Sequence, residues 1–418
     1  MPSLHAPGAA VSADELDELR EIIDDELPAY LEDLASLVNV DCGSYTKAGV
    51  DQVGRWTARY LERLGAEVEI RPDEKLGDTV VGTLSGQPGG PRVLLIGHLD
   101  TVFPEGTART RPFRIDAGVA RGPGVTDMKS GLLAGLYAIL ALRALGASDD
   151  DDEEEALLPF ERLVFVSNPD EEIGSPSSSP HIRELALESD ACFVLECARA
   201  NGDIVSARKG TVDLRLVVRG RAAHAGVEPE KGRSAILEAA HQTIALQALN
   251  GRWPDVTCNV GVVHGGTRPN VVAEEAILEV DLRASSREHL EAAEAAVRAA
   301  AAATTVADVT VTVEEAARHW PMEKLPRSVR LVEHALAIAD RLGFGLADCS
   351  TGGASDANTT AGLGVPTLDG LGPIGGNDHS PVEYLEVDSI VPRTTLLAAL
   401  LLAVARDPLV ASWRPHPA

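Results

Sequence analysis

Short apolar runs and amphipathic stretches alternate along the first two hundred residues. Four apolar residues and a glycine at 93–97 run directly into His98, and Pro91 and Pro104 bound this stretch. A run this short and apolar is typical of a strand that is buried on both faces. We expect strands at 67–70, 79–84, 93–98, 163–167 and 191–195. We expect helices at 12–39, broken or kinked at Pro28, and at 49–64 and 131–145. The alternation predicts an α/β fold.

The hydrophobic pattern changes near residue 208. Thr211 to Val218 alternates apolar and polar residues, as a half-buried strand of an antiparallel sheet does. Further strands are expected at 257–263, 276–283 and 309–313, and further helices at 234–248 and 288–303. The order β-α-β-β-α-β matches a ferredoxin-like unit, so we predict a compact α+β insert of about 110 residues at 208–317. The first domain, 1–207, then resumes at 318–418 with helices at 328–342 and 389–404.

Acidic residues far outnumber basic ones. The chain has 64 Asp and Glu against 37 Lys and Arg, a formal net charge of −27. This balance argues against nucleic acid or an anionic membrane as a partner, because both need a basic face. The seven consecutive acids at 149–155 are expected to form a solvated loop. No secretory signal or membrane span is evident, and the five cysteines form no C-x-x-C pair. We therefore expect reduced cysteines and a cytoplasmic protein.

Titratable residues gather at the ends of the predicted strands and in the turns nearby. The residues concerned are His98, Asp100, Asp127, Glu171, Glu172, Glu196 and His379. Simpler explanations exist for single members: a structural histidine, a helix N-cap at Asp127 or a solvated turn at 170–172. Taken together, two imidazoles and several carboxylates suit two divalent metals, zinc before cobalt or manganese. Calcium fits poorly because it prefers oxygen ligands only. A carboxylate that bridges two ions is the usual hydrolytic arrangement.

Five motifs of this chain, in this order, resemble the M20 family of metallopeptidases. Within that family the chain is most similar to glutamate carboxypeptidases of the carboxypeptidase G2 type. The motifs are Gly97-His98-Leu99-Asp100-Thr101-Val102, Gly124-Val125-Thr126-Asp127-Met128-Lys129, Asp170-Glu171-Glu172-Ile173-Gly174-Ser175, Gly220-Arg221-Ala222-Ala223-His224-Ala225-Gly226 and His379-Ser380. The resemblance covers nearly the whole chain. It implies an α/β mixed-sheet zinc-peptidase catalytic domain with an inserted ferredoxin-like α+β domain, which serves as lid and dimerisation domain.

The resemblance implies a role for each residue of the acidic cluster. The implied ligands are His98, Asp127 and Glu196 for one zinc ion, and Asp127, Glu172 and His379 for the other. Asp100 would orient His98 and fix the tautomer that leaves one ring nitrogen free for the metal. Glu171 would be the general base, aimed at the water between the ions. The resemblance also implies a cis peptide bond between Asp127 and Met128.

The insert resembles the family's lid, which contributes to substrate binding. His224 matches the histidine that reaches into a partner's active site and stabilises the tetrahedral oxyanion. Alternating strands alone would make it a plain surface histidine. Asn270 and Arg283 resemble substrate-binding positions. Arg283 and Arg318 are candidates for the substrate's terminal carboxylate, because guanidinium binds carboxylate bidentately. Gly353 and the glycine before it would let backbone approach the substrate, or form a simple loop.

The leading functional hypothesis is a homodimeric two-zinc hydrolase. It would cleave an amide or peptide bond next to a free carboxylate, in a small molecule or a peptide, and release a C-terminal amino acid such as glutamate. The alternative is an aminoacylase or deacetylase on N-acyl amino acids, because both reactions attack an amide carbonyl. Glu196 fits these two branches better than the family's ureidohydrolases. A metal-free binding protein would have lost a ligand or Glu171, and a serine hydrolase would show a Gly-x-Ser-x-Gly elbow; the chain fits neither.

Overall fold

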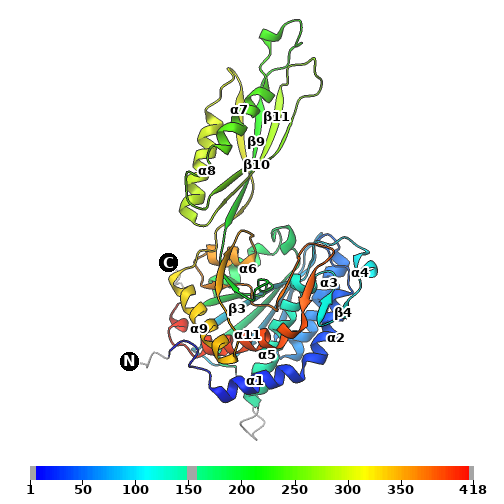
Figure 1. Ribbon diagram of the computed structural model, residues 1–418, viewed down its shortest axis with the longest axis vertical. Helices are drawn as coiled ribbons and strands as arrows, with labels where there is room; N and C mark the ends of the chain where they lie inside the picture. Colours follow the sequence, from blue (N-terminus) through cyan, green and yellow to red (C-terminus); the bar gives the residue numbers. More distant parts are fainter. Residues whose placement is uncertain (1–5, 148–157, 414–418) are drawn as a thin grey trace. The chain divides into compact units, whose positions relative to one another are not determined.

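The computed structural model describes residues 6–147 and 158–413, and the chain forms two compact units. The large unit comprises Met1–Ser206, Lys324–Ser350 and Ser355–Ala418, and the inserted unit comprises Ala207–Glu323 and Thr351–Ala354 (Figure 1). The predicted insert ended at 317, but its last strand, β12, runs from Thr310 to His319. The predicted acidic loop at 149–155 lies outside the described residues.

The large unit is built on a six-stranded mixed sheet, with the strand order β1-β2-β6-β3-β7-β14. The strand bounds are β1 Glu67–Arg71, β2 Thr79–Ser85, β3 Arg92–His98, β6 Arg162–Asn168, β7 Ala191–Val194 and β14 Thr367–Leu368. β3 lies in the middle, parallel to both β6 and β7, and is buried from Val93 to His98. Burial on both faces, predicted from its apolar run, is confirmed. The carboxyl end of β3 therefore opens among the ends of two parallel neighbours.

Helices pack around this sheet in the large unit. Their bounds are α1 Ala13–Asp25, α2 Leu27–Val38, α3 Lys47–Arg63, α4 Thr107–Thr110, α5 Ser130–Ala147, α6 Ser179–Leu187, α9 Pro326–Leu342, α10 Asp356–Gly362 and α11 Ile390–Ala405. The predicted helix at 12–39 is divided at Glu26, and Pro28 falls in the first turn of α2, where its missing N–H costs nothing. The helices α4, α6 and α10 were not predicted.

Within residues 6–147 and 158–413, two helical segments are long and apolar enough to cross a membrane by length and composition, Val125–Leu145 and Val387–Ala405. In each, 78% of the apolar window is buried inside the protein. Their helices α5 and α11 pack against each other, and both contribute to the hydrophobic core of the large unit. Packing inside the large unit accounts for their composition.

A second, small sheet of the large unit joins segments that are far apart in sequence. Its order is β15-β16-β5-β4, with all neighbours antiparallel. The bounds are β4 Arg114–Asp116, β5 Val119–Arg121, β15 Gly375–Gly376 and β16 Tyr384–Glu386. This sheet holds the chain that leads into Asp127 beside the chain around His379. β8 Ile204–Arg208 and β13 Asp348–Thr351 form a separate two-stranded sheet.

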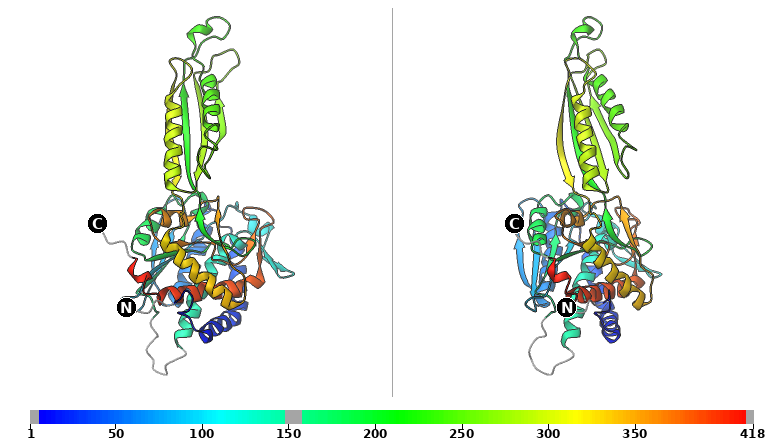
Figure 2. Two further views of the ribbon diagram at one scale, coloured as in Figure 1. Left: turned by 60° about the vertical axis from the view of Figure 1, so that its left-hand side comes forward. Right: turned by 90° about the vertical axis from the view of Figure 1, so that its left-hand side faces the viewer.

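The inserted unit follows the predicted order β-α-β-β-α-β. Its elements are β9 Gly210–Arg219, α7 Ala235–Gln247, β10 Thr257–Gly265, β11 Glu275–Ala284, α8 Arg287–Ala302 and β12. The four strands form an antiparallel sheet in the order β10-β11-β9-β12, and α7 and α8 cover one face of it (Figure 2). Along β9, Val212, Leu214 and Leu216 are buried while Asp213 and Arg215 are exposed, which confirms the predicted alternation. The unit has a hydrophobic core of its own.

Candidate metal centre

His98 occupies the carboxyl end of the central strand β3, and its side chain is 1% exposed. Its ring Nδ1 donates to the backbone carbonyl of Asp100 at 2.9 Å, while the Asp100 carboxylate lies at 3.4 Å. The opposite nitrogen, Nε2, lies 3.1 Å from Asp127 Oδ1 and 3.8 Å from Glu196 Oε1. Asp100 therefore orients the ring through its main chain, and Nε2 faces two carboxylates as a metal-binding nitrogen would.

Asp127 lies in a tight turn between β5 and α5. Gly124 has a φ of +72°, a conformation that favours glycine, and the peptide bond between Asp127 and Met128 is cis, as expected. The two carboxylate oxygens of Asp127 face different histidines. Oδ1 lies 3.1 Å from His98 Nε2, and Oδ2 lies 3.1 Å from His379 Nε2. A single carboxylate thus lies between both imidazoles, the position of a bridging ligand.

Glu171 and Glu172 follow β6 in a single helical turn, Glu171–Ile173. The Glu172 carboxylate lies 3.0 Å from His379 Nε2. Ligand atoms of His98, Asp127 and Glu172 all lie within 4.8 Å of one another, and so do those of His98, Glu171 and Glu196. The structure thus brings all five predicted ligands and Glu171 into one cluster.

The Asp100 carboxylate holds the turn that carries both glutamates. It accepts the backbone N–H groups of Glu171 and Glu172, each at 3.2 Å, and the Ser44 hydroxyl at 2.6 Å. Main-chain and side-chain atoms of one residue therefore position His98 on one side and the glutamate turn on the other. Sequence reasoning anticipated only the contact with His98.

Asp170, the first acid of the 170–172 run, has a different environment from the two glutamates. The Asp170 carboxylate turns away from the cluster and accepts from Ser177 N–H, Ser177 Oγ and Ser178 Oγ. Asp356, which was not predicted, is buried and accepts from the Ser175 hydroxyl at 2.6 Å. These hydrogen bonds stabilise the segment that follows the glutamate turn. Of the three adjacent acids, Asp170 therefore supports the local structure, whereas Glu171 and Glu172 belong to the cluster.

The electrostatics of the cluster indicate a demand for cations. Burial and the charge of Glu196 raise the pKa of Glu171, and burial raises the pKa of Glu172. Hydrogen bonds to Asp127 and Glu172 raise the pKa of His379 to about 11. Burial opposes ionisation of Asp127, yet the two histidines lower its pKa. Carboxylates packed this closely repel one another in a medium of low dielectric, and divalent ions would neutralise them. The two imidazoles and three carboxylates of the predicted ligands fit such ions.

Two residues missed in the sequence support the Asp127 turn. Lys129 is 1% exposed, and its Nζ donates to the carbonyl oxygens of Pro123 and Val40 at 3.2 and 3.4 Å. Glu383 is 2% exposed and accepts hydrogen bonds from backbone N–H groups of the same turn. Neither follows a periodic pattern, and the only signal is their nearness in sequence to Asp127 and His379.

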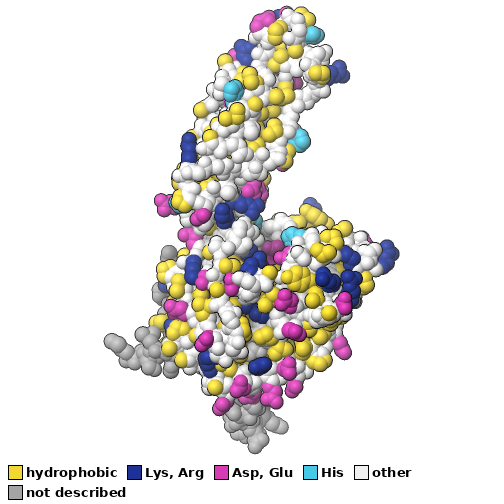
Figure 3. All heavy atoms as spheres, viewed as in Figure 1, with side chains coloured by type: hydrophobic (Ala, Val, Ile, Leu, Met, Phe, Trp, Pro, Cys, Tyr) yellow, Lys and Arg dark blue, Asp and Glu magenta, His cyan; other side chains and the backbone are white. Residues whose placement is uncertain are grey.

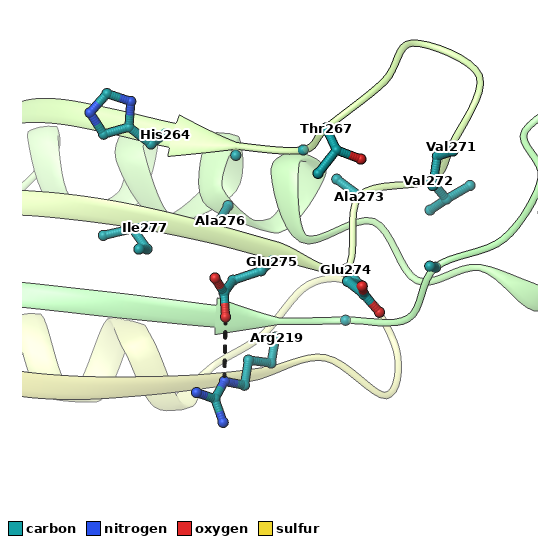
Figure 4. A pocket seen from close by; sticks show the side chains of 14 residues that line it. Arg219, His264, Thr267, Val271, Val272, Ala273, Glu274, Glu275, Ala276 and Ile277 are labelled. Atoms are coloured by element: carbon teal, nitrogen blue, oxygen red, sulfur yellow. Dashed lines mark ion pairs between the residues drawn. The ribbon is translucent and has the colours of Figure 1, made fainter.

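The other predicted site residues, His224, Asn270, Arg283, Arg318 and Gly353, lie in the inserted unit. His224 pairs with Val271 through an isolated β-bridge, and Ala225 N–H donates to the Asn270 carbonyl at 3.0 Å, so His224 and Asn270 lie together. Beside them is a groove of about 510 Å³ at the ends of β9, β10 and β11, where Arg219 faces Glu275 at 3.9 Å (Figure 4). None of the six cluster residues of the large unit lines this groove.

The predicted arginines of the inserted unit already have partners. Arg283 Nε lies 2.9 Å from Asp281, and its Nη1 donates to the Gly352 carbonyl at 2.9 Å. The next carbonyl, that of Gly353, accepts from Arg208 at 3.0 Å. Arg318 is paired with Glu294 and Glu315, each at 2.6 Å, and its guanidinium lies over the ring of Trp320. Arg318 is more heavily neutralised than Arg283.

Comparison with known proteins places this geometry in a family. A model of peptidase family M20/M25/M40 matches residues 94–403. The chain is 28% identical over 400 residues to carboxypeptidase G2 of Pseudomonas sp. (strain RS-16), covering 94% of each chain. It is 29% identical over 279 residues to acetylornithine deacetylase of Proteus mirabilis (strain HI4320), which is 62% of this chain and 67% of the relative. The aminopeptidase PepT from Bacillus cereus shares the fold, with a TM-score of 0.72, 24% identity, and coverage of 95% of this chain and 100% of that one.

The family match spans most of the chain and includes the whole cluster described above. The family implies a dinuclear metal site, and the His, Asp and Glu groups for one are present. The chain is therefore a metallohydrolase that belongs to peptidase family M20/M25/M40.

Proposed function

We propose that this metallohydrolase cleaves an amide or peptide bond next to a free carboxylate and releases a C-terminal amino acid such as glutamate. The observation that carries the proposal is the position of Glu171, within 4.8 Å of the ligand atoms of His98 and Glu196. A carboxylate there is within reach of a water that attacks a carbonyl. The carboxypeptidase choice is supported by the similarity to carboxypeptidase G2 over 94% of the chain.

We further propose two zinc ions, with cobalt or manganese as substitutes. His98, Asp127 and Glu196 would hold one ion, and Asp127, Glu172 and His379 the other. The contacts of the two Asp127 oxygens with different imidazoles support a bridging role. When bound, the ions polarise the amide carbonyl and make a water a stronger nucleophile.

The protein's own groups would then move the proton. Glu171 would take the proton that the water loses as its oxygen attacks the amide carbon. It would deliver the same proton to the leaving nitrogen as the C–N bond breaks, so that one carboxylate acts first as base and then as acid. Burial and the charge of Glu196, which raise the pKa of Glu171, favour a group that can carry a proton between these steps.

His224 would donate to the oxyanion of the tetrahedral intermediate, and Asn270, its neighbour in the inserted unit, would contact the substrate. Arg283 is the better candidate for the substrate carboxylate, because Arg318 already faces two glutamates. Gly353 would present backbone to the substrate. These assignments rest on the motif matches, and the neighbourhood of His224 and Asn270 supports their acting together.

We propose that the enzyme is a homodimer that pairs through the inserted unit. Apolar side chains lie exposed on α7 and β10 of this unit, with Ile244 70%, Leu237 52%, Val263 50% and Ile236 47% exposed. Hydrophobic side chains are visible on the face of the inserted unit seen in Figure 3. β10 is also an edge strand of its sheet. Ile244→Asp should shift the mass measured by light scattering toward the monomer, and an unchanged mass would contradict this interface.

A cytoplasmic location remains our proposal. Cys42, Cys192, Cys197 and Cys258 are buried free thiols in the structure, which suits a reducing compartment. A membrane-fractionation and periplasmic-release experiment in the source cell would test it, with recovery outside the cytoplasm as the contrary result.

The second candidate function is an N-acyl amino acid deacetylase. The similarity to acetylornithine deacetylase over 62% of the chain favours it, and the same cluster would attack an acetyl carbonyl. The two reactions differ in which side of the amide carries the recognised group.

The test is a substrate panel on protein loaded with zinc, cobalt or manganese. It compares N-acyl-L-glutamates that carry large acyl groups, N-acetyl amino acids and dipeptides, with released amino acids measured by chromatography. We expect glutamate release from the large N-acyl-glutamates to give the highest kcat/KM. A preference for N-acetyl-ornithine would select the deacetylase, and no turnover of any amide by metal-loaded protein would overturn both.

A further inference from the structure

Glu383 makes an unusual set of hydrogen bonds for a residue outside the metal cluster. Its carboxylate accepts three backbone N–H groups of the Asp127 turn: Gly124 N–H on Oε2 at 3.0 Å, and Thr126 and Asp127 N–H on Oε1 at 2.9 and 3.1 Å. The side chain is 2% exposed. The two oxygens of one carboxylate thus serve all three donors, and these N–H groups would otherwise lack partners.

The residue belongs to the same compact turn as His379. Ser380 N–H donates to the Asn377 carbonyl at 3.2 Å, and Glu383 N–H donates to the Ser380 carbonyl at 3.3 Å. His379 itself has a φ of +61°, so its backbone conformation is specific to this turn. Because main-chain bonds connect the turn from 377 to 383, a shift of Glu383 would move His379 with it.

The segment that leads into the His379 turn also approaches the Asp127 turn directly, with the backbone of Gly375 close to the side chain of Thr126. A Cβ atom built on Gly375, in β15, would lie 2.0 Å from Thr126 Oγ1, so the approach requires glycine. β16, which begins one residue after Glu383, pairs with β5 just before the Asp127 turn. Glu383 therefore closes a contact between the segment that ends in Asp127 and the segment that carries His379.

We propose that Glu383 is a positioning residue of the metal centre, which fixes the bridging carboxylate of Asp127 against His379. The inference rests on the proposed two-metal function and adds a residue that contacts neither ion nor substrate. Its specific consequence concerns the ion held by Asp127, Glu172 and His379. That ion would take Asp127 and His379 from the two turns that Glu383 joins, whereas His98 ends the strand β3 and Glu196 follows the strand β7.

Two substitutions remove the hydrogen bonds between Glu383 and the Asp127 turn to different extents. Glu383→Ala removes all three acceptors. In Glu383→Gln one oxygen still accepts from Thr126 and Asp127, but the amide NH2 meets the Gly124 N–H. The matched control is Glu386→Ala, an exposed glutamate of the neighbouring strand β16. The three variants thus differ in their hold on the Asp127 turn and share the loss of one negative charge.

The main measurement is zinc binding by competition with a chromophoric chelator, on full-length protein whose folding is checked by circular dichroism. We expect Glu383→Ala to weaken one of the two zinc affinities by about 10–100-fold, that of the ion proposed for Asp127, Glu172 and His379, as is usual when a residue that supports a metal ligand is lost. Glu383→Gln should lie between Glu383→Ala and wild type, and Glu386→Ala should match wild type. If Glu383→Ala does not fold, the comparison of Glu383→Gln with wild type decides.

A residue that supported only the fold would lower the melting temperature of apo and metal-loaded protein alike and leave both zinc affinities unchanged. That result, in either Glu383 variant, would overturn the inference. Wild-type protein that binds no zinc and cleaves no amide would instead overturn the proposed function. The two failures are therefore distinguishable on the same preparations.

Discussion

Several candidate site residues differ in exposure between the two units of this protein. In the large unit, His98 and Asp100 are each 1% exposed at the end of a strand that is buried on both faces. In the inserted unit, His224 is exposed, and the side chain of Arg283 is 37% exposed on a sheet that buries one face only. Burial strengthens electrostatic interactions and holds ligands still, which a metal centre needs. Exposed groups are available for recognition of a ligand.

The largest expected effect concerns the buried side of this comparison. Glu171→Gln keeps the shape of the side chain but removes the base, so kcat should fall by about 10²–10⁴-fold. Two zinc equivalents should remain, measured by elemental analysis of the same sample that is used for kinetics. Glu386→Gln serves as the exposed control. Turnover within a few-fold of wild type would remove Glu171 from the mechanism.

The exposed side of the comparison is tested at His224. If this histidine donates to the oxyanion, His224→Ala should lower kcat by about 10²–10³-fold without loss of zinc. His264→Ala, another exposed histidine of the inserted unit, should leave kcat unchanged. Dimer mass is measured for both variants, so that a change in assembly is not mistaken for lost chemistry. If His224→Ala has the same kcat as His264→Ala, His224 is not a catalytic group, and all catalytic groups belong to the large unit.

A smaller effect is expected at Asp100, which contacts His98 through its carbonyl and the glutamate turn through its carboxylate. In Asp100→Asn the carbonyl remains, but an amide NH2 faces one of the two backbone N–H groups. Zinc affinity should fall by about 10–100-fold in the chelator competition. The exposed Asp116→Asn is the control. Wild-type affinity would mean that the main-chain contact with His98 is sufficient.

The smallest effect concerns a buried histidine of the large unit outside the cluster. His334 Nε2 lies 2.8 Å from Asp407 and Nδ1 accepts from Gly8 N–H at 2.9 Å, while burial lowers the pKa of His334. The unfolded chain therefore binds a proton first as pH falls below about 6.5, and the folded state loses stability by up to about 1.4 kcal/mol per pH unit. His334→Gln should remove this slope.

The free energy of unfolding is measured by chemical denaturation of zinc-loaded wild type and His334→Gln. The measurement is repeated from about pH 7.5 to about pH 5.5, a range that brackets the usual histidine pKa. Parallel curves would show that His334 titrates alike in both states.

The elements with a strong hydrophobic period were predictable. The buried run of β3 and the alternation of β9 each matched the structure, and the order of the inserted unit followed from them. The strands of the small sheet were not predicted, because elements such as Gly375–Gly376 are too short to show a period. The helix α10, Asp356–Gly362, is likewise short and carries few large apolar residues.

The site could be predicted as far as its motifs reach. Distances between His98, Asp127 and His379 agree with shared ligation, although their roles remain a prediction. The supporting hydrogen bonds of Glu383 and the ion pairs of Arg318 could not be predicted, because they join residues distant in sequence through side-chain geometry. A sequence motif gives the residue type at each position, but not the residue with which its side chain forms a hydrogen bond or ion pair.

The small sheet β15-β16-β5-β4 has a consequence for how the enzyme is made. It joins residues 114–121 to residues 375–386, so its formation closes a loop of more than 250 residues that includes the entire inserted unit. Contacts of such long sequence separation form late in folding. A nascent chain on the ribosome therefore lacks His379 until the whole inserted unit has been translated, and the cluster of His98, Asp127 and His379 cannot be complete before then.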